Sequence, residues 1–123
     1  MQSLRIAVAG PYSAATPIQR RRNLDLMNAA AAELMRRGHV PIIGVNAALP
    51  VVDRLFADPE DGPSPPGRND AIMAISMAVI ENCDAILHLA PSPGADRERD
   101  HLAARGKLVY RSLAEVPPAR SGA

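Results

Sequence analysis

The chain has 123 residues, the size of one domain, and 47% of them are apolar, which is typical of a globular protein. Its 14 basic and 13 acidic side chains leave a net charge of +1, which argues against a general binder of nucleic acid or of membrane surfaces. Cys83 is the single cysteine and no long apolar run is present, so we expect a cytoplasmic protein without an internal disulfide, a signal peptide or a membrane span.

The first half of the chain predicts two strands and two helices. Residues 4–9 form a short apolar run that predicts a buried strand. The next helix begins after Thr16, a good capping residue, and ends at Gly38, a common helix terminator. A second apolar run predicts a strand over residues 40–45, and a short helix is expected over residues 50–57.

The second half continues the same alternation. Residues 58–68 hold four prolines and two glycines, and we expect a flexible loop there, either a passive surface insertion or a lid. Asn69 or Asp70 can cap the following helix, which runs to about Asn82. The remaining expected elements are a strand over 84–90, a helix over 96–105, a strand over 107–110, a helical turn over 112–115 and a disordered tail over 117–123.

Strands that alternate with helices predict an α/β fold. We expect one domain over residues 1–116, with a parallel sheet of four to five strands and helices on both faces. In such sheets ligands bind outside the carboxyl ends of the strands. The turns after the predicted strands gather small and polar residues at that edge, namely Gly10, Pro11, Tyr12, Ser13, Asn46, Ser92, Gly94, Arg111 and Ser112.

The turn from Ser92 to Gly94 precedes the predicted helix that carries Glu98. Backbone N–H groups at a helix start attract anions, so we expect Ser92, Gly94 and Ala95 to hold an anionic group there. Glu98, expected in the first helical turn and kept ionised by it, is a candidate nucleophile or base. The alternative is an ordinary strand-to-helix turn, in which Glu98 only stabilises the start of the helix.

Other chemistry is less well supported by the residues. Tyr12 can stack on a base or a sugar, or it can be an exposed loop residue. The basic run of residues 20–22 predicts a solvated helix face, or one arginine turned toward a phosphate. The three histidines lack metal-site spacing, and the dinucleotide, P-loop and serine-hydrolase motifs are absent, so we expect no metal and no redox cofactor.

Several segments together resemble the nucleoside 2-deoxyribosyltransferase superfamily, in particular its small 2′-deoxynucleoside 5′-phosphate N-hydrolases and related bacterial members. The segments that carry the resemblance are residues 5–13 (Arg-Ile-Ala-Val-Ala-Gly-Pro-Tyr-Ser), Asn23, residues 38–41, residues 83–86, the pattern Ser92-x-Gly94-x-x-x-Glu98 and residues 106–110. The resemblance implies a flavodoxin-like fold that cleaves the N-glycosidic bond of a nucleoside or nucleotide, by hydrolysis or by transfer to a second base.

The resemblance also implies roles for single residues. The family's catalytic glutamate corresponds to Glu98, which would attack the anomeric carbon, and Ser92 and Gly94 would hold a 5′-phosphate. Two positions depart from the family, because Ala7 stands where a tyrosine is usual and Ser76 stands where an aspartate assists the leaving base. Asp70 and Tyr12 are possible substitutes for that acid.

Three functions follow from the sequence. The first is a glycosidase or transferase with Glu98 as nucleophile and with Gly10, Pro11, Tyr12, Asn46, Ser92, Gly94 and Ala95 around the substrate. The second is a non-catalytic nucleotide-binding or sensor protein of the same fold, and the third is an interaction domain without a small ligand. Helices rich in Ala and Met, together with the resemblance, predict a homo-oligomer, either a dimer or a tetramer.

Overall fold

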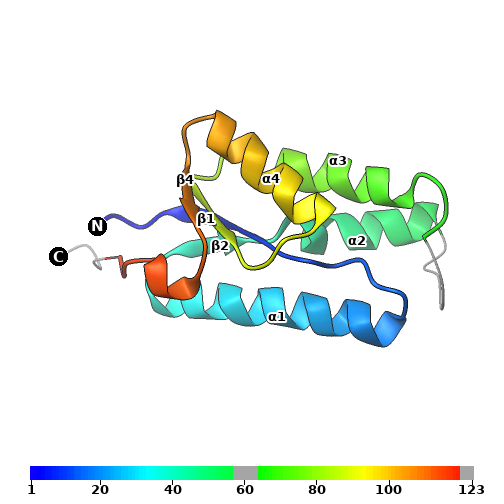
Figure 1. The fold of residues 1–123 in the computed structure, drawn as a ribbon, viewed down its shortest axis with the longest axis horizontal. Coiled ribbons are helices and arrows are strands. Elements are labelled where there is room, and N and C mark those ends of the chain that lie inside the picture. Colours follow the sequence, from blue (N-terminus) through cyan, green and yellow to red (C-terminus); the bar gives the residue numbers. More distant parts are fainter. Residues whose placement is uncertain (57–63, 120–123) are drawn as a thin grey trace.

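The computed structural model describes residues 1–56 and 64–119 (Figure 1). Its elements in chain order are β1 (Arg5–Ala9), α1 (Pro17–Arg36), β2 (Val40–Ile42), α2 (Gly44–Leu55), α3 (Arg68–Ile80), β3 (Ala85–His88), α4 (Pro93–Ala104), β4 (Leu108–Tyr110) and the 3₁₀ helix η1 (Leu113–Glu115). The predicted loop over residues 58–68 lies largely outside the described residues, which resume at Ser64.

The strands of the described residues form one parallel sheet in the order β2-β1-β3-β4. Figure 1 shows α1 on one side of the sheet and α3 and α4 on the other, with α2 running beside α3. The predicted α/β fold, with a parallel sheet and helices on both faces, is therefore confirmed, and the sheet has four strands. From β1 the chain crosses to one neighbour, β2, and later returns to the other, β3, so the strand order reverses between β1 and β3.

Each face of the sheet has its own apolar core, because successive side chains of a strand point to opposite faces. On one face Ile6 and Val8 of β1 belong to a cluster with Met27 and Leu34 of α1. On the other face the cluster is built from two alanines of β1, from Ile86 of β3, from buried positions of α3 and α4 and from the turn before β3, namely Ala7, Ala9, Ile80, Cys83, Ile86, Ala95 and Leu102. Small side chains on this face allow α4 to approach the sheet closely.

The region after β2 corrects the sequence prediction. A strand was expected over residues 40–45 and a short helix over residues 50–57, but β2 ends at Ile42 and α2 already begins at Gly44. The new helix packs against α3 so closely that a Cβ at Gly44 would lie only 2.8 Å from both Cα and Cβ of Ser76. Buried Ala48 and Val52 continue this helix face and outweigh the unfavourable Pro50 inside the helix.

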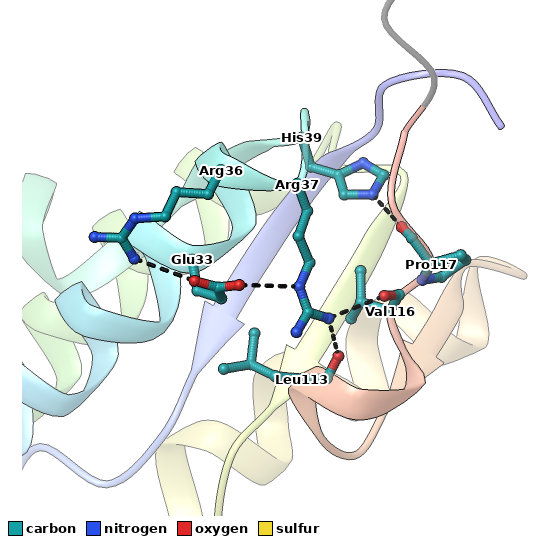
Figure 2. Close-up of polar contacts among 7 residues, drawn as sticks. All are labelled: Glu33, Arg36, Arg37, His39, Leu113, Val116 and Pro117. Carbon is teal, nitrogen blue, oxygen red and sulfur yellow. Dashed lines mark hydrogen bonds and ion pairs between the residues drawn. The ribbon is translucent and has the colours of Figure 1, made fainter.

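The C-terminal end of the described chain is fastened to the end of α1 (Figure 2). Arg37 donates hydrogen bonds from Nη1 to the carbonyl oxygens of Leu113 and Val116, the second at 3.1 Å. Glu33 accepts from Nε of the same arginine at 3.3 Å, and the two guanidinium groups beside it lower the pKa of the Glu33 carboxyl. One side chain thus connects α1 to η1, across 76 residues of sequence.

His39 joins both ends of the described chain at the same place. Its ring is 1% exposed, Nδ1 accepts the N–H of Leu4 at 3.1 Å, and Nε2 lies 2.7 Å from the carbonyl oxygen of Pro117 (Figure 2). Because Nδ1 accepts, Nε2 carries the proton and donates to Pro117. The N–H of Ala119 also donates to the carbonyl of Arg37 at 2.8 Å. The tail predicted to be disordered from Pro117 is therefore held as far as Ala119, and residues 120–123 lie outside the described residues.

Candidate active site

A cavity of about 260 Å³ lies where the strand order reverses, beyond the carboxyl ends of β1 and β3. Its walls come from the turn after β1, from the start of α4, from α3 and from single residues of α1 and α2. The lining residues are Val8, Ala9, Gly10, Tyr12, Ser13, Met27, Val45, Asn69, Asp70, Ile72, Met73, Ser76, Ser92, Pro93, Gly94, Ala95, Arg97 and Glu98. Six of the eight residues predicted for the site therefore meet in one place.

The turn after β1 forms one wall and is held from α1. Asn23 donates from Nδ2 to the carbonyl oxygen of Tyr12 at 3.1 Å, and Arg20 donates from Nη1 to the carbonyl oxygen of Ala14 at 2.8 Å. Arg20 is 5% exposed, so the predicted solvated face holds for Arg21 and Arg22 but not for Arg20. At Gly10 a Cβ would lie 3.4 Å from Cγ of Met27, so the turn follows α1 closely.

The start of α4 forms the opposite wall and differs from the prediction. The helix begins at Pro93 instead of Asp96, because Ser92 caps it and Pro93 suits its first position. The Oγ of Ser92 accepts the N–H of Ala95 at 3.1 Å. Gly94 therefore lies inside the first turn, where a Cβ would be 3.2 Å from Sδ of Met73 on α3.

Glu98 lies in the second turn of α4, and Asp96 takes the place in the first turn that was expected for Glu98. The Glu98 side chain is on the buried side of the helix and only 8% exposed. Within the described residues its Oε2 has no hydrogen-bond partner. Burial raises the pKa of Glu98 from 4.5 to about 7, so the expectation that the helix start keeps this carboxyl ionised is wrong.

Ser76 is the second buried polar group of the cavity. It is 1% exposed on α3, and its Oγ also lacks a hydrogen-bond partner in the part of the chain that the structure describes. The close contact of α3 with Gly44 of α2 fixes the position of Ser76. Two buried oxygens without partners in one cavity are a site where a ligand or water supplies the missing hydrogen bonds.

Two predicted site residues do not line this cavity. Asn46 lies in α2 and donates from Nδ2 to Oδ1 of Asn28 on α1 at 2.8 Å. Pro11 lines a neighbouring hollow of about 420 Å³ between α1, the end of β3 and η1. Ala7 is fully buried in the core between the sheet and α4.

The cavity also contains residues that the sequence analysis did not assign to it, chiefly Met73 and Arg97. Asn69, Met73 and Ser76 recur at helical spacing, and this pattern was the available signal that one face of α3 lines the site. Arg97 is exposed, next to Glu98 in sequence, and no periodicity distinguishes it from the other charged residues of α4.

Two histidines near α4 have carboxylate partners outside the cavity. Nε2 of His101 lies 3.0 Å from Oε2 of Glu81, so this histidine is engaged away from Glu98. His88 pairs with Asp96 at 2.8 Å. Cys83 is buried as predicted, and burial raises the pKa of its thiol to about 11. Among the described residues, no cluster of three or more His, Cys, Asp or Glu side chains is arranged to hold a metal ion.

Comparisons with protein-family models, with curated proteins and with solved structures gave no significant match. Residues 1–56 and 64–119 contain no helix long and apolar enough to cross a membrane.

Proposed function

We propose that the protein cleaves the N-glycosidic bond of a nucleotide or nucleoside, with Glu98 as the nucleophile. The observation that carries this proposal is a carboxyl group, 8% exposed and without a partner among the described residues, that lines a cavity at the reversal of strand order. Burying a carboxyl group without a partner is costly, and such groups occur where function needs them. The resemblance to nucleoside deoxyribosyltransferases assigns the same residue.

The chemistry parallels that of a retaining glycosidase. Glu98 attacks the anomeric carbon while the C1′–N bond breaks, and water or a second base then displaces the carboxylate. The reacting sugar develops positive charge, which favours the ionised form of a nearby carboxyl group. The raised pKa of Glu98 is therefore expected to fall as positive charge develops on the sugar in the transition state.

The start of α4 supports binding of an anionic group. The Oγ of Ser92 accepts the N–H of Ala95, so its own hydroxyl hydrogen stays available to donate to a phosphate oxygen. Arg97 lies at the mouth of the cavity and adds a positive charge close to the helix start. A nucleoside monophosphate, with its phosphate at Ser92 and Gly94 and its sugar over Glu98, fits this distribution of charge.

A non-catalytic nucleotide-binding or sensor protein is the second candidate. The observation in its favour is Ser76, a buried lining residue whose hydroxyl is too weak an acid to protonate a leaving base. In that case the cavity binds a nucleotide, and Glu98 only orients its sugar.

Base release from a panel of nucleosides and nucleoside monophosphates, neutral and cationic, separates the two functions. For the enzyme we expect release by the wild type and a loss of at least about 1,000-fold in Glu98→Gln. Glu115→Gln, which changes an exposed glutamate of η1, is the matched control. Undiminished release by Glu98→Gln would overturn the assignment, and a thermal shift without release would favour the binding protein.

We further propose that the protein is cytoplasmic and forms a homo-oligomer. Its single cysteine suits a reducing compartment. Large apolar side chains are exposed on several helices, among them Ile18, Leu26, Met35 and Leu55. Light scattering at micromolar concentration tests the assembly, and a monomer would refute it.

A further inference from the structure

We propose that the substrates of this site are N-glycosides whose base is positively charged at the bond to be broken, such as pyridinium ribosides, because the described residues of the cavity include one buried carboxyl group, Glu98, and a buried serine, while the second carboxyl group, Asp70, is exposed. This inference rests on the proposed glycosidic cleavage and specifies its substrate class. Neutral bases leave slowly unless an acid protonates them, whereas a cationic base leaves as a neutral molecule without any proton.

The first observation is the distribution of acids in the cavity. Among the described residues, its titratable lining side chains are Tyr12, Asp70, Arg97 and Glu98. Of these two carboxyl groups only Glu98 is buried, and as the proposed nucleophile it cannot also protonate the leaving base. Asp70 is exposed, and it lies six residues before Ser76 on α3, about 9 Å along the helix axis. The buried polar side chain that α3 contributes to the cavity is Ser76, whose hydroxyl is not an acid at neutral pH.

The second observation is the missing counter-charge of Glu98. Oε2 of this carboxyl group has no hydrogen-bond partner among the residues described, and its one cationic neighbour in the lining, Arg97, is exposed at the mouth. A positive charge near a carboxyl group favours the ionised form. A cationic substrate would therefore supply a positive charge that the described residues do not place against Oε2, and it would favour ionisation of its own nucleophile on binding.

The third observation is the apolar wall. Val45, Ile72 and Met73 surround the polar groups of the cavity. Thioether and aliphatic side chains suit the flat ring of an aromatic base but cannot protonate it. The wall therefore binds the base without assisting its departure.

The reaction balances without an acid. A carboxylate oxygen of Glu98 bonds to C1′, the C1′–N bond breaks, and its electron pair neutralises the positive ring nitrogen of the leaving base. Water then attacks C1′, the bond to the carboxylate oxygen breaks, and one proton passes to solvent. Hydrolysis of the cationic substrate thus releases one proton per base, whereas a neutral substrate must gain a proton on its base.

The test compares nicotinamide mononucleotide, a pyridinium riboside, with the monophosphates of uridine and adenosine, using the full chain. Base release is measured by chromatography and divided by the uncatalysed rate of each compound. Because a general acid contributes about 10² to 10⁴-fold, we expect this enhancement to be at least about 100-fold larger for the pyridinium compound. The variant Ser76→Asp, which installs an acid, should raise the rate for the neutral compounds at least about 10-fold without raising it for the pyridinium compound.

Each outcome decides the matter. Equal enhancements for cationic and neutral compounds would overturn the inference and leave the glycosidase intact. Cleavage of the neutral compounds that is lost in Asp70→Asn or Tyr12→Phe would overturn it as well, by revealing the missing acid. No release from any compound, or release that survives in Glu98→Gln, would remove the proposed function itself. The wild-type comparison needs no variant, so it stands even where Ser76→Asp fails to fold.

Discussion

The burial of Glu98 predicts that the protein loses stability as the pH rises. Its pKa is raised by burial from 4.5 to about 7 in the folded chain, so folding favours the protonated form. The unfolded state releases this proton near pH 4.5, and the folded state releases it only near pH 7. The contribution of Glu98 to the free energy of unfolding is therefore fully present below about pH 4.5, decreases as the pH rises, and is lost above about pH 7.

The magnitude follows from the same two pKa values. Each pKa unit corresponds to about 1.4 kcal/mol, so ionised Glu98 costs the folded state about 3 kcal/mol at pH 8. Glutamine has nearly the shape of the protonated side chain and cannot ionise. Glu98→Gln should therefore be more stable than the wild type by about 3 kcal/mol at pH 8, or about 10 °C in melting temperature, and by less than about 1 kcal/mol at pH 5.

Thermal and urea unfolding of both proteins at pH 5 and pH 8 measure this difference. The exposed Glu115→Gln serves as the matched control and should show no pH-dependent gain. A Glu98→Gln advantage that is the same at both pH values would refute the reasoning, because it would mean that the carboxyl group is solvated and titrates normally.

Two further substitutions test the packing around the site and the C-terminal attachment. Gly44→Ala should destabilise the protein by about 1 to 3 kcal/mol, because the added Cβ would overlap Ser76. The control, Ala47→Gly on the exposed side of α2, should cost only about 1 kcal/mol, the usual helix preference of alanine over glycine. Urea midpoints compare the two variants, and a Gly44→Ala protein as stable as the wild type would mean that α2 and α3 are not this close. His39→Phe should destabilise the protein by about 2 kcal/mol, because two hydrogen bonds are lost, and should expose the C-terminal residues to protease. The control, Arg36→Ala, removes a solvated guanidinium and should change neither stability nor proteolysis. C-terminal cleavage of His39→Phe at the wild-type rate would contradict the attachment.

Local signals sufficed for most of the fold. The capping pattern at Thr16 placed the start of α1, and its Oγ accepts the N–H of Gln19 at 3.2 Å as the pattern predicts. The apolar runs predicted the ends of β1 and β3 with errors of at most two residues. The failure at α2 has a tertiary cause. Residues 40–45 are apolar throughout, which a buried strand and a buried helix share. The packing of α2 against α3, which includes the close contact between Gly44 and Ser76, favours the helix from Gly44 onward.

In the candidate site, the predicted start of one helix, α4, determined the protonation state expected for Glu98. The start of α4 was placed three residues too late, which put Glu98 in the first turn, where the helix dipole stabilises a carboxylate by about 0.3 to 1 kcal/mol. In the structure Glu98 lies between Ala95 and Leu102 on the buried face of the helix, and burial raises its pKa to about 7. Desolvation, worth about 3 kcal/mol, is larger than the dipole effect and acts in the opposite direction. The spacing of Ala95, Glu98 and Leu102 puts all three residues on one helix face, so the sequence pattern predicts a buried Glu98 even where the start of the helix is misplaced.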